Sequence, residues 1–186
     1  MIPVTPCIRV VTGIFFVLFS RFAKQIIVYF GFYKQIQKRM ELKIDLYTQG
    51  ERPEVTKPHP DFLKTLGEEG VRKMVSRHYD LLRVSEIKNL FPDEEEEFGK
   101  AKQRSADFMI QICGGPDYFN QNRGRPMLIN RHSPFSITSE GRIIWLECYR
   151  VALTETNLPE HLILSFWNYI QVFSAWMINS TPKTEK

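Results

Sequence analysis

The stretch Arg131-His132-Ser133-Pro134-Phe135 holds the histidine around which the rest of the chain can be interpreted. Gly124 interrupts the chain before it, Pro126 suits a first helical position, and Met127 to Arg131 can form a turn or two of helix. Pro134 opposes continuation, so His132 is predicted to lie at a helix end. A lone histidine in such a place is either a packed core or surface residue or a ligand for a metal.

Further motifs occur before and after this stretch. In chain order they are Val75-Ser76-Arg77-His78-Tyr79, Phe91-Pro92, Gly114-Gly115-Pro116, Arg123-Gly124-Arg125-Pro126 and Trp145-Leu146-Glu147-Cys148. In order and spacing the set resembles the group II truncated haemoglobins over about residues 60–180. The resemblance implies an all-α, two-over-two truncated globin fold with an N-terminal extension. It also implies a non-covalent haem b (iron protoporphyrin IX) with His132 as the proximal iron ligand.

The resemblance assigns roles to other side chains of this sequence. It implies a distal, gas-binding pocket formed by Tyr79, Phe91, Ala101, Ser105 and Trp145. Cofactor contacts are expected from two arginines that could pair with the haem propionates and from three aromatic rings, namely Arg104, Arg131, Phe98, Phe108 and Phe135. The sequence departs from the family pattern twice, because Phe91 stands where some members have tyrosine and Ser105 where a larger apolar residue is common. The number of donors around the ligand therefore cannot be copied from relatives.

Apolar periodicity predicts helices on either side of these motifs. The expected helices run from about Glu69 to Arg83, from about Glu95 to Cys113, from around Thr138 onwards, and from about Pro159 to Asn179. Gly114-Gly115-Pro116 should end the second of these helices sharply. No stretch between the helices reads as a strand.

The predicted helix over residues 95–113 has an unusual inner face. Ala101 and Ser105 lie between the larger Phe98, Phe108 and Ile112. Small residues between large ones leave a hollow, which a flat cofactor would fill, and a close helix crossing explains the same pattern equally well.

Two polar aromatic residues need partners if they are buried. Tyr79 falls on the apolar face of its helix, and its hydroxyl must bond a backbone carbonyl, another side chain or a bound ligand. The indole nitrogen of Trp145 is only a donor, so it needs an acceptor; simple core packing is the alternative to a ligand contact.

Composition excludes several classes of function. The formal charge of +4 arises from six basic and no acidic residues in positions 1–40, while the remainder holds 19 basic and 21 acidic residues. A folded part without a basic surface does not favour nucleic-acid binding. The three cysteines are far apart and form no Cys-x-x-Cys-His motif, which favours a reducing, cytoplasmic setting without disulfides or covalent haem attachment.

The chain is expected to contain one domain with extensions at both ends. Residues 1–39 are apolar and basic, residues 40–60 form a polar leader, residues 61–180 form the globin domain, and residues 181–186 form a tail. Arg21 and Lys24 interrupt the apolar stretch, which disfavours a membrane span. Our preferred hypothesis is that Met40 is the true start; a membrane-surface anchor is the alternative, and membrane contact is expected only if residues 1–39 belong to the native protein.

The expected function is reversible binding of O2, and of other diatomic gases such as CO and NO, at a histidine-ligated haem. An alternative is an NO dioxygenase or a peroxidase supplied with electrons by a separate reductase, because no flavin or nicotinamide domain is apparent. A haem-free helical interaction module is the third hypothesis. A monomer or a homodimer fits the sequence equally well.

Overall fold

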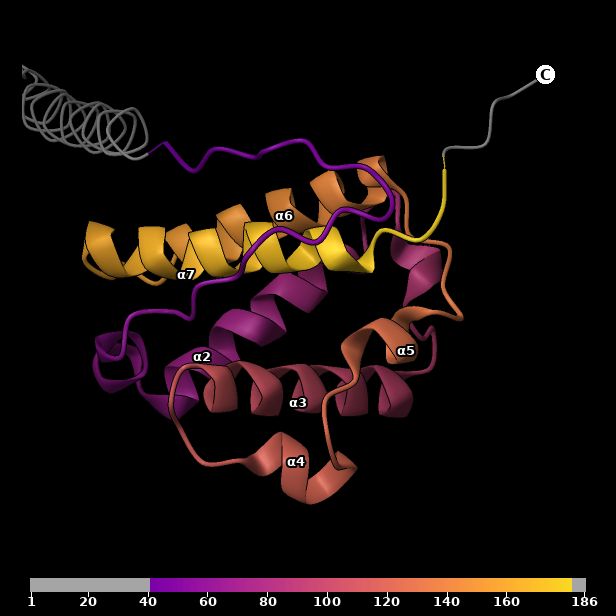
Figure 1. Cartoon of the computed structure of the whole chain (residues 1–186). Coiled ribbons are helices and arrows are strands. Elements are labelled where there is room, and N and C mark those ends of the chain that lie inside the picture. Colours follow the sequence, from indigo (N-terminus) through magenta and orange to yellow (C-terminus); the bar gives the residue numbers. More distant parts are fainter. Residues whose placement is uncertain (1–40, 182–186) are drawn as a thin grey trace, which may run out of the picture. The chain divides into compact units, whose positions relative to one another are not determined.

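The computed structural model describes residues 41–181, and within them every regular element is a helix. The predictions made for residues 1–39 and for residues 182–186 lie outside this range. Figure 1 shows α6 and α7 running alongside each other on one side of α2 and α3. Helix α2 packs against α3 and α6, and α6 packs against α7. The predicted all-helical, two-over-two truncated globin fold is therefore confirmed.

Helix α2 spans Asp61–Leu82 and contains a break at Gly67, where φ is +73° and ψ is 162°. The helix predicted from about Glu69 to Arg83 corresponds to the part after this break. Glycine has no Cβ and adopts a positive φ with little strain, which explains why the break falls there. The buried face after the break includes Val71, Val75 and Leu82, as the periodicity predicts, and it also includes His78.

Helix α3 spans Glu95–Ile112 and ends at the predicted glycine-rich stop. Gly114 has a φ of +88°, and the N–H of Gly115 donates to the carbonyl of Ile110 over 3.0 Å. A Cβ on Gly115 would lie 2.6 Å from the Ile110 side chain and 2.7 Å from that of Leu63. A larger residue would therefore force the chain away from the helix at this turn.

Helix α6 spans Ser139–Thr154 and begins where the sequence predicts. The Thr138 hydroxyl accepts a hydrogen bond from the N–H of Gly141 over 3.1 Å, which is the usual role of threonine at a helix N-cap.

The last predicted helix is divided in the structure. Helix α7 spans Glu160–Phe173, and the 3-10 helix η2 continues from Ser174 to Met177. The carbonyl of Gln171 accepts hydrogen bonds from the Arg142 guanidinium and, over 3.2 Å, from the Ser174 hydroxyl. Both bonds satisfy a carbonyl near the end of α7. The chain then continues as a 3-10 helix and becomes extended at Ile178.

Three short elements connect the long helices: η1 (Lys88–Leu90), α4 (Tyr118–Arg123) and α5 (Leu128–His132). Helix α5 ends at His132, as predicted. Its start differs from the expectation, because Met127 has a left-handed φ of 39° and Pro126 precedes the helix instead of beginning it. The Arg131 guanidinium holds this turn by donating to the carbonyls of Arg123, Arg125 and Pro126.

Residues 42–60, which we call the strap, run along α6 and α7 without regular structure (Figure 1). Side chains of these helices donate to strap carbonyls: Trp167 Nε1 to Lys43 over 2.8 Å and Arg150 to Leu42 over 2.7 Å. Trp176 Nε1 donates to Pro53 over 2.9 Å. None of the helices within residues 41–181 is both long and apolar enough to cross a membrane.

Candidate functional site

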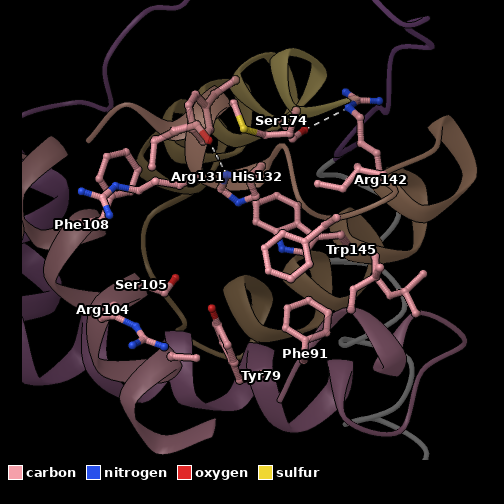
Figure 2. A pocket seen from close by; sticks show the side chains of 18 of the residues that line it. Tyr79, Phe91, Arg104, Ser105, Phe108, Arg131, His132, Arg142, Trp145 and Ser174 are labelled. Carbon is pink, nitrogen blue, oxygen red and sulfur yellow. Dashed lines mark hydrogen bonds between the residues drawn. The ribbon is translucent and has the colours of Figure 1, made fainter. Parts of the chain in front are cut away.

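A cavity of about 330 Å³ opens between α2, α3, α5 and α6. Ten of the eleven side chains predicted for the site line it: Tyr79, Phe91, Ala101, Arg104, Ser105, Phe108, Arg131, His132, Phe135 and Trp145. Helices far apart in the chain supply these residues, and Figure 2 shows how their side chains surround the opening. Most of the lining is apolar, which favours a flat hydrophobic ligand.

Phe98 is the predicted site residue that does not line the cavity. Its buried ring packs behind Tyr79, with ring centroids 5.6 Å apart, and the Arg83 guanidinium lies 4.6 Å from its centre. Helical periodicity placed Phe98 correctly on the inner face of α3. The site lies one turn further along that face, so Phe98 supports a wall residue and has no direct contact with the cavity.

His132 is held in one orientation by its own helix. Its Nδ1 lies 2.7 Å from the Leu128 carbonyl, four residues earlier. A carbonyl only accepts, so Nδ1 carries the proton and Nε2 keeps its lone pair. Burial lowers the pKa of His132, and the bond to Leu128 offsets this in part. Figure 2 shows the second ring nitrogen turned into the cavity, so the unprotonated nitrogen of a neutral imidazole faces the opening.

Trp145 offers a hydrogen-bond donor to the cavity. Its indole nitrogen lies in the opening in Figure 2 and has no acceptor among residues 41–181. The other two indole groups of the chain donate to strap carbonyls. The N–H of Trp145 is therefore available to a ligand in the cavity.

Tyr79 and Ser105 add hydroxyl groups to the same cavity. Figure 2 shows the two hydroxyls turned toward each other on the side away from His132. Burial raises the pKa of Tyr79, while Ser105 and the Arg104 guanidinium lower it in part. The hydroxyl of Tyr79 is therefore protonated near neutral pH and can donate.

Four arginines lie along the cavity, and they differ in their partners. Arg104 has no ion pair or hydrogen bond within residues 41–181, so its guanidinium is available to an anion. Arg131 is already bonded to three backbone carbonyls, and it lies 5.6 Å from the centre of the Phe119 ring. The predicted pairing of Arg131 with a propionate would have to share its donors with this turn.

Arg123 and Arg142 also line the cavity, and neither is among the site residues predicted from the sequence. Arg142 is 3% exposed and donates to the Ser174 hydroxyl over 3.0 Å and to the Asp45 carbonyl over 2.9 Å. It precedes Trp145 by three residues on α6, and residues at that spacing share a helix face. That spacing was a signal available from the sequence.

The comparisons with known proteins agree with this geometry. A family model described as bacterial-like globin matches residues 62–179. The group 2 truncated hemoglobin YjbI of Bacillus subtilis (strain 168) is 28% identical over 126 residues, which cover 66% of this chain and 92% of that protein.

Solved structures show the same similarity. Phosphate-bound Hell's gate globin IV has a TM-score of 0.69 and 36% identity, covering 76% of this chain and 88% of its own. A truncated oxygen-avid haemoglobin from Bacillus subtilis has a TM-score of 0.60 and 26% identity, covering 63% of this chain and 98% of its own.

A two-over-two helical fold around an apolar cavity with one oriented histidine defines a haem-binding globin. The chain belongs to the bacterial-like globin family, and its relatives are group II truncated haemoglobins, as the sequence motifs predict. The residues present fit a haem: Nε2 of His132 keeps a lone pair that could bind iron, the lining is apolar, and Arg104 is available to a carboxylate. Among residues 41–181 no three His, Cys, Asp or Glu side chains gather to hold a metal without a cofactor.

Proposed function

We propose that the protein reversibly binds O2, and other diatomic gases such as CO and NO, at a haem b held by His132. The observation that carries the proposal is the hydrogen bond from His132 Nδ1 to the Leu128 carbonyl, which leaves Nε2 free for a metal inside the cavity. In haem proteins the hydrogen bond on the second ring nitrogen sets the tautomer and the basicity of the ligating one. The iron of a bound haem would supply the site for the gas.

The side chains around the cavity would hold this cofactor by packing and charge. Phe108 and Phe135, which line the cavity, would pack on its faces or edges. Phe135 is 44% exposed in this structure, which is high for a phenylalanine beside an apolar cavity and fits a partner that covers it. Arg104, and with fewer free donors Arg131, would pair with the two propionates.

Trp145 and Tyr79 would act on the gas by donating hydrogen bonds. The indole N–H of Trp145 has no protein acceptor within the described residues, and the pKa of Tyr79 is raised by burial, so both groups retain their protons. Each bond would strengthen retention by about 1 kcal/mol and slow release accordingly. The similarity to a haemoglobin described as oxygen-avid supports oxygen as the ligand.

The first test is the absorption spectrum of the purified protein as isolated, reduced, and reduced with CO. The wild type is expected to show a Soret band that shifts with CO, and His132→Ala should lose or grossly alter it. His59→Ala is the matched control, because His59 is exposed and does not line the cavity. Absence of a band after haem is supplied would contradict the proposal.

The second test is the rate of O2 dissociation in Trp145→Phe. Loss of one hydrogen bond of about 1 kcal/mol should accelerate release roughly fivefold. Trp176→Phe is the control, because its indole bonds to Pro53 and lies outside the cavity. Equal rates in the wild type and in Trp145→Phe would show that Trp145 does not contact the gas.

A further inference from the structure

Three aromatic rings pack together at the wall of the cavity. The His78 ring of α2 stacks on the Tyr149 ring of α6, with centroids 3.6 Å apart and planes inclined by 27°. The His78 and Trp145 rings are perpendicular, with centroids 5.1 Å apart and planes inclined by 88°, and the centroids of Tyr149 and Trp145 are 4.6 Å apart. Neither His78 nor Tyr149 lines the cavity, and both are buried. Trp145 is thus the member of this cluster that reaches the ligand side.

His78 also bonds the backbone of Trp145. Its Nε2 lies 3.2 Å from the Trp145 carbonyl. Because the carbonyl only accepts, Nε2 carries the proton. Carbonyls inside an α-helix accept the N–H four residues later, so His78 uses the second lone pair of this carbonyl. The bond joins α2 to α6 at the residue that presents the indole.

Ring packing alone does not explain a histidine at position 78. Nδ1 of His78 is buried and has no hydrogen-bond partner among residues 41–181. A buried polar atom without a partner is destabilising, and phenylalanine would fill the same space without one. The feature that histidine adds is the bond from Nε2 to the Trp145 carbonyl.

We propose that His78 is a positioning residue that fixes the Trp145 indole in its orientation toward the cavity and thereby slows release of the gas. The His78 ring packs against the indole, and the hydrogen bond restrains the backbone that carries it. The effect on the gas rests on the proposed function, while the effect on the indole does not.

The test compares three substitutions of His78 in the haem-loaded protein. His78→Phe keeps a ring and removes the bond. His78→Gln places an amide nitrogen near the position of Nε2, whereas the shorter His78→Asn does not reach it. The control Val75→Ala removes packing from the same buried face of α2 and leaves the bond intact. If His78→Phe fails to fold, the comparison of His78→Gln with His78→Asn still tests whether the hydrogen bond to the Trp145 carbonyl orients the indole.

The first measurement is the NMR signal of each indole N–H in the CO form. The chain has three tryptophans, and the signal missing in Trp145→Phe identifies the relevant one. We expect His78→Phe and His78→Asn to shift the Trp145 signal and Val75→Ala to leave it in place. His78→Gln, which returns the bond without the ring, should bring the signal closer to its wild-type position than His78→Asn does. Signals from Trp167 and Trp176, which bond to the strap, should not move. An unchanged Trp145 signal in His78→Phe and His78→Asn would overturn the positioning role.

The second measurement is the rate of O2 dissociation in the same variants. Release should accelerate about twofold to fivefold in His78→Phe, because weakening the hydrogen bond to the ligand has at most the effect of losing it. If Trp145→Phe accelerates release and His78→Phe does not, the proposed effect of His78 on the gas is overturned. If Trp145→Phe itself has no effect, the proposed function of Trp145 fails, and a shifted indole signal still supports positioning by His78.

Discussion

His78 is buried and His132 is half-buried, and these two imidazoles use their ring nitrogens in opposite ways. His132 donates from Nδ1 to a carbonyl of its own helix and leaves Nε2 in the cavity. His78 donates from Nε2 to the Trp145 carbonyl and leaves Nδ1 buried. A backbone acceptor selects the tautomer in each case, and this difference underlies the two roles that we propose, a ligand for His132 and a positioning residue for His78.

The buried His78 should make the stability of the protein depend on pH. Burial lowers the pKa of His78 from 6.5 to about 3, and the bond to Trp145 offsets this only in part. Between these values the unfolded chain binds a proton that the folded chain does not, so stability falls as the pH decreases below 6.5. The free energy of unfolding of the wild type should decrease by up to about 1.4 kcal/mol more per pH unit than that of His78→Phe.

Urea unfolding of both proteins between pH 7 and pH 5 measures this difference. The pKa of His132 is lowered as well, and its contribution has the same sign in both proteins and cancels. Parallel profiles would show that His78 is protonated in the folded state.

Within the helices, the backbone conformation of a glycine determines whether another residue could replace it. The space available for a side chain matters less. Gly67 and Gly99 both have room for a Cβ, with no atom within 4 Å of its ideal position. Gly67 has a φ of +73° at the break in α2, whereas Gly99 lies inside the regular helix α3. The break separates the segment that carries Tyr79 from residues 61–66, where Phe62 stacks on Phe166 of α7.

Alanine at these two positions should have opposite effects. Gly67→Ala should destabilise the protein by about 1 to 2 kcal/mol, because an L-residue is strained at positive φ. Gly99→Ala should stabilise it by up to about 1 kcal/mol through helix propensity. Chemical denaturation of both variants beside the wild type measures the pair. A Gly67→Ala variant as stable as Gly99→Ala would mean that the break does not depend on the φ of Gly67.

The described part of the molecule is held together at one side by Arg142. Its guanidinium donates to the Asp45 carbonyl of the strap, to the Gln171 carbonyl of α7 and to the Ser174 hydroxyl of η2. Burial lowers the pKa of Arg142, and the charges of Tyr47 and Asp45 oppose this. One side chain thus joins the strap and the end of α7 to α6, next to the cavity.

Arg142→Met should therefore be strongly destabilising. Two buried acceptors and one part-buried acceptor would lose their donor, which we expect to lower the free energy of unfolding by about 3 kcal/mol or more. Arg77→Met is the matched control, because Arg77 pairs with Glu155 on the surface and such pairs contribute little. Thermal unfolding of both variants measures the contrast. Similar losses in the two variants would show that the strap is not held through Arg142.

Much of the fold was predictable because its signals are local. Apolar spacing located the long helices, the glycines and proline at 114–116 ended α3, and Thr138 preceded α6. His132 was placed at a helix end from its immediate neighbours. Such signals depend on residues three or four positions apart, so they can be identified from the sequence alone.

The sequence by itself thus determined the all-helical class, the main helix ends and the position of the histidine. Tertiary structure alone decided that Phe98 lies outside the cavity, that Arg131 bonds to its own turn, and that His78 faces the Trp145 carbonyl. The partners of His78 and Arg142 lie 67 and up to 97 residues away. The periodicity of a helix indicates which of its faces is buried. Only the packing of distant helices determines which residues that face contacts.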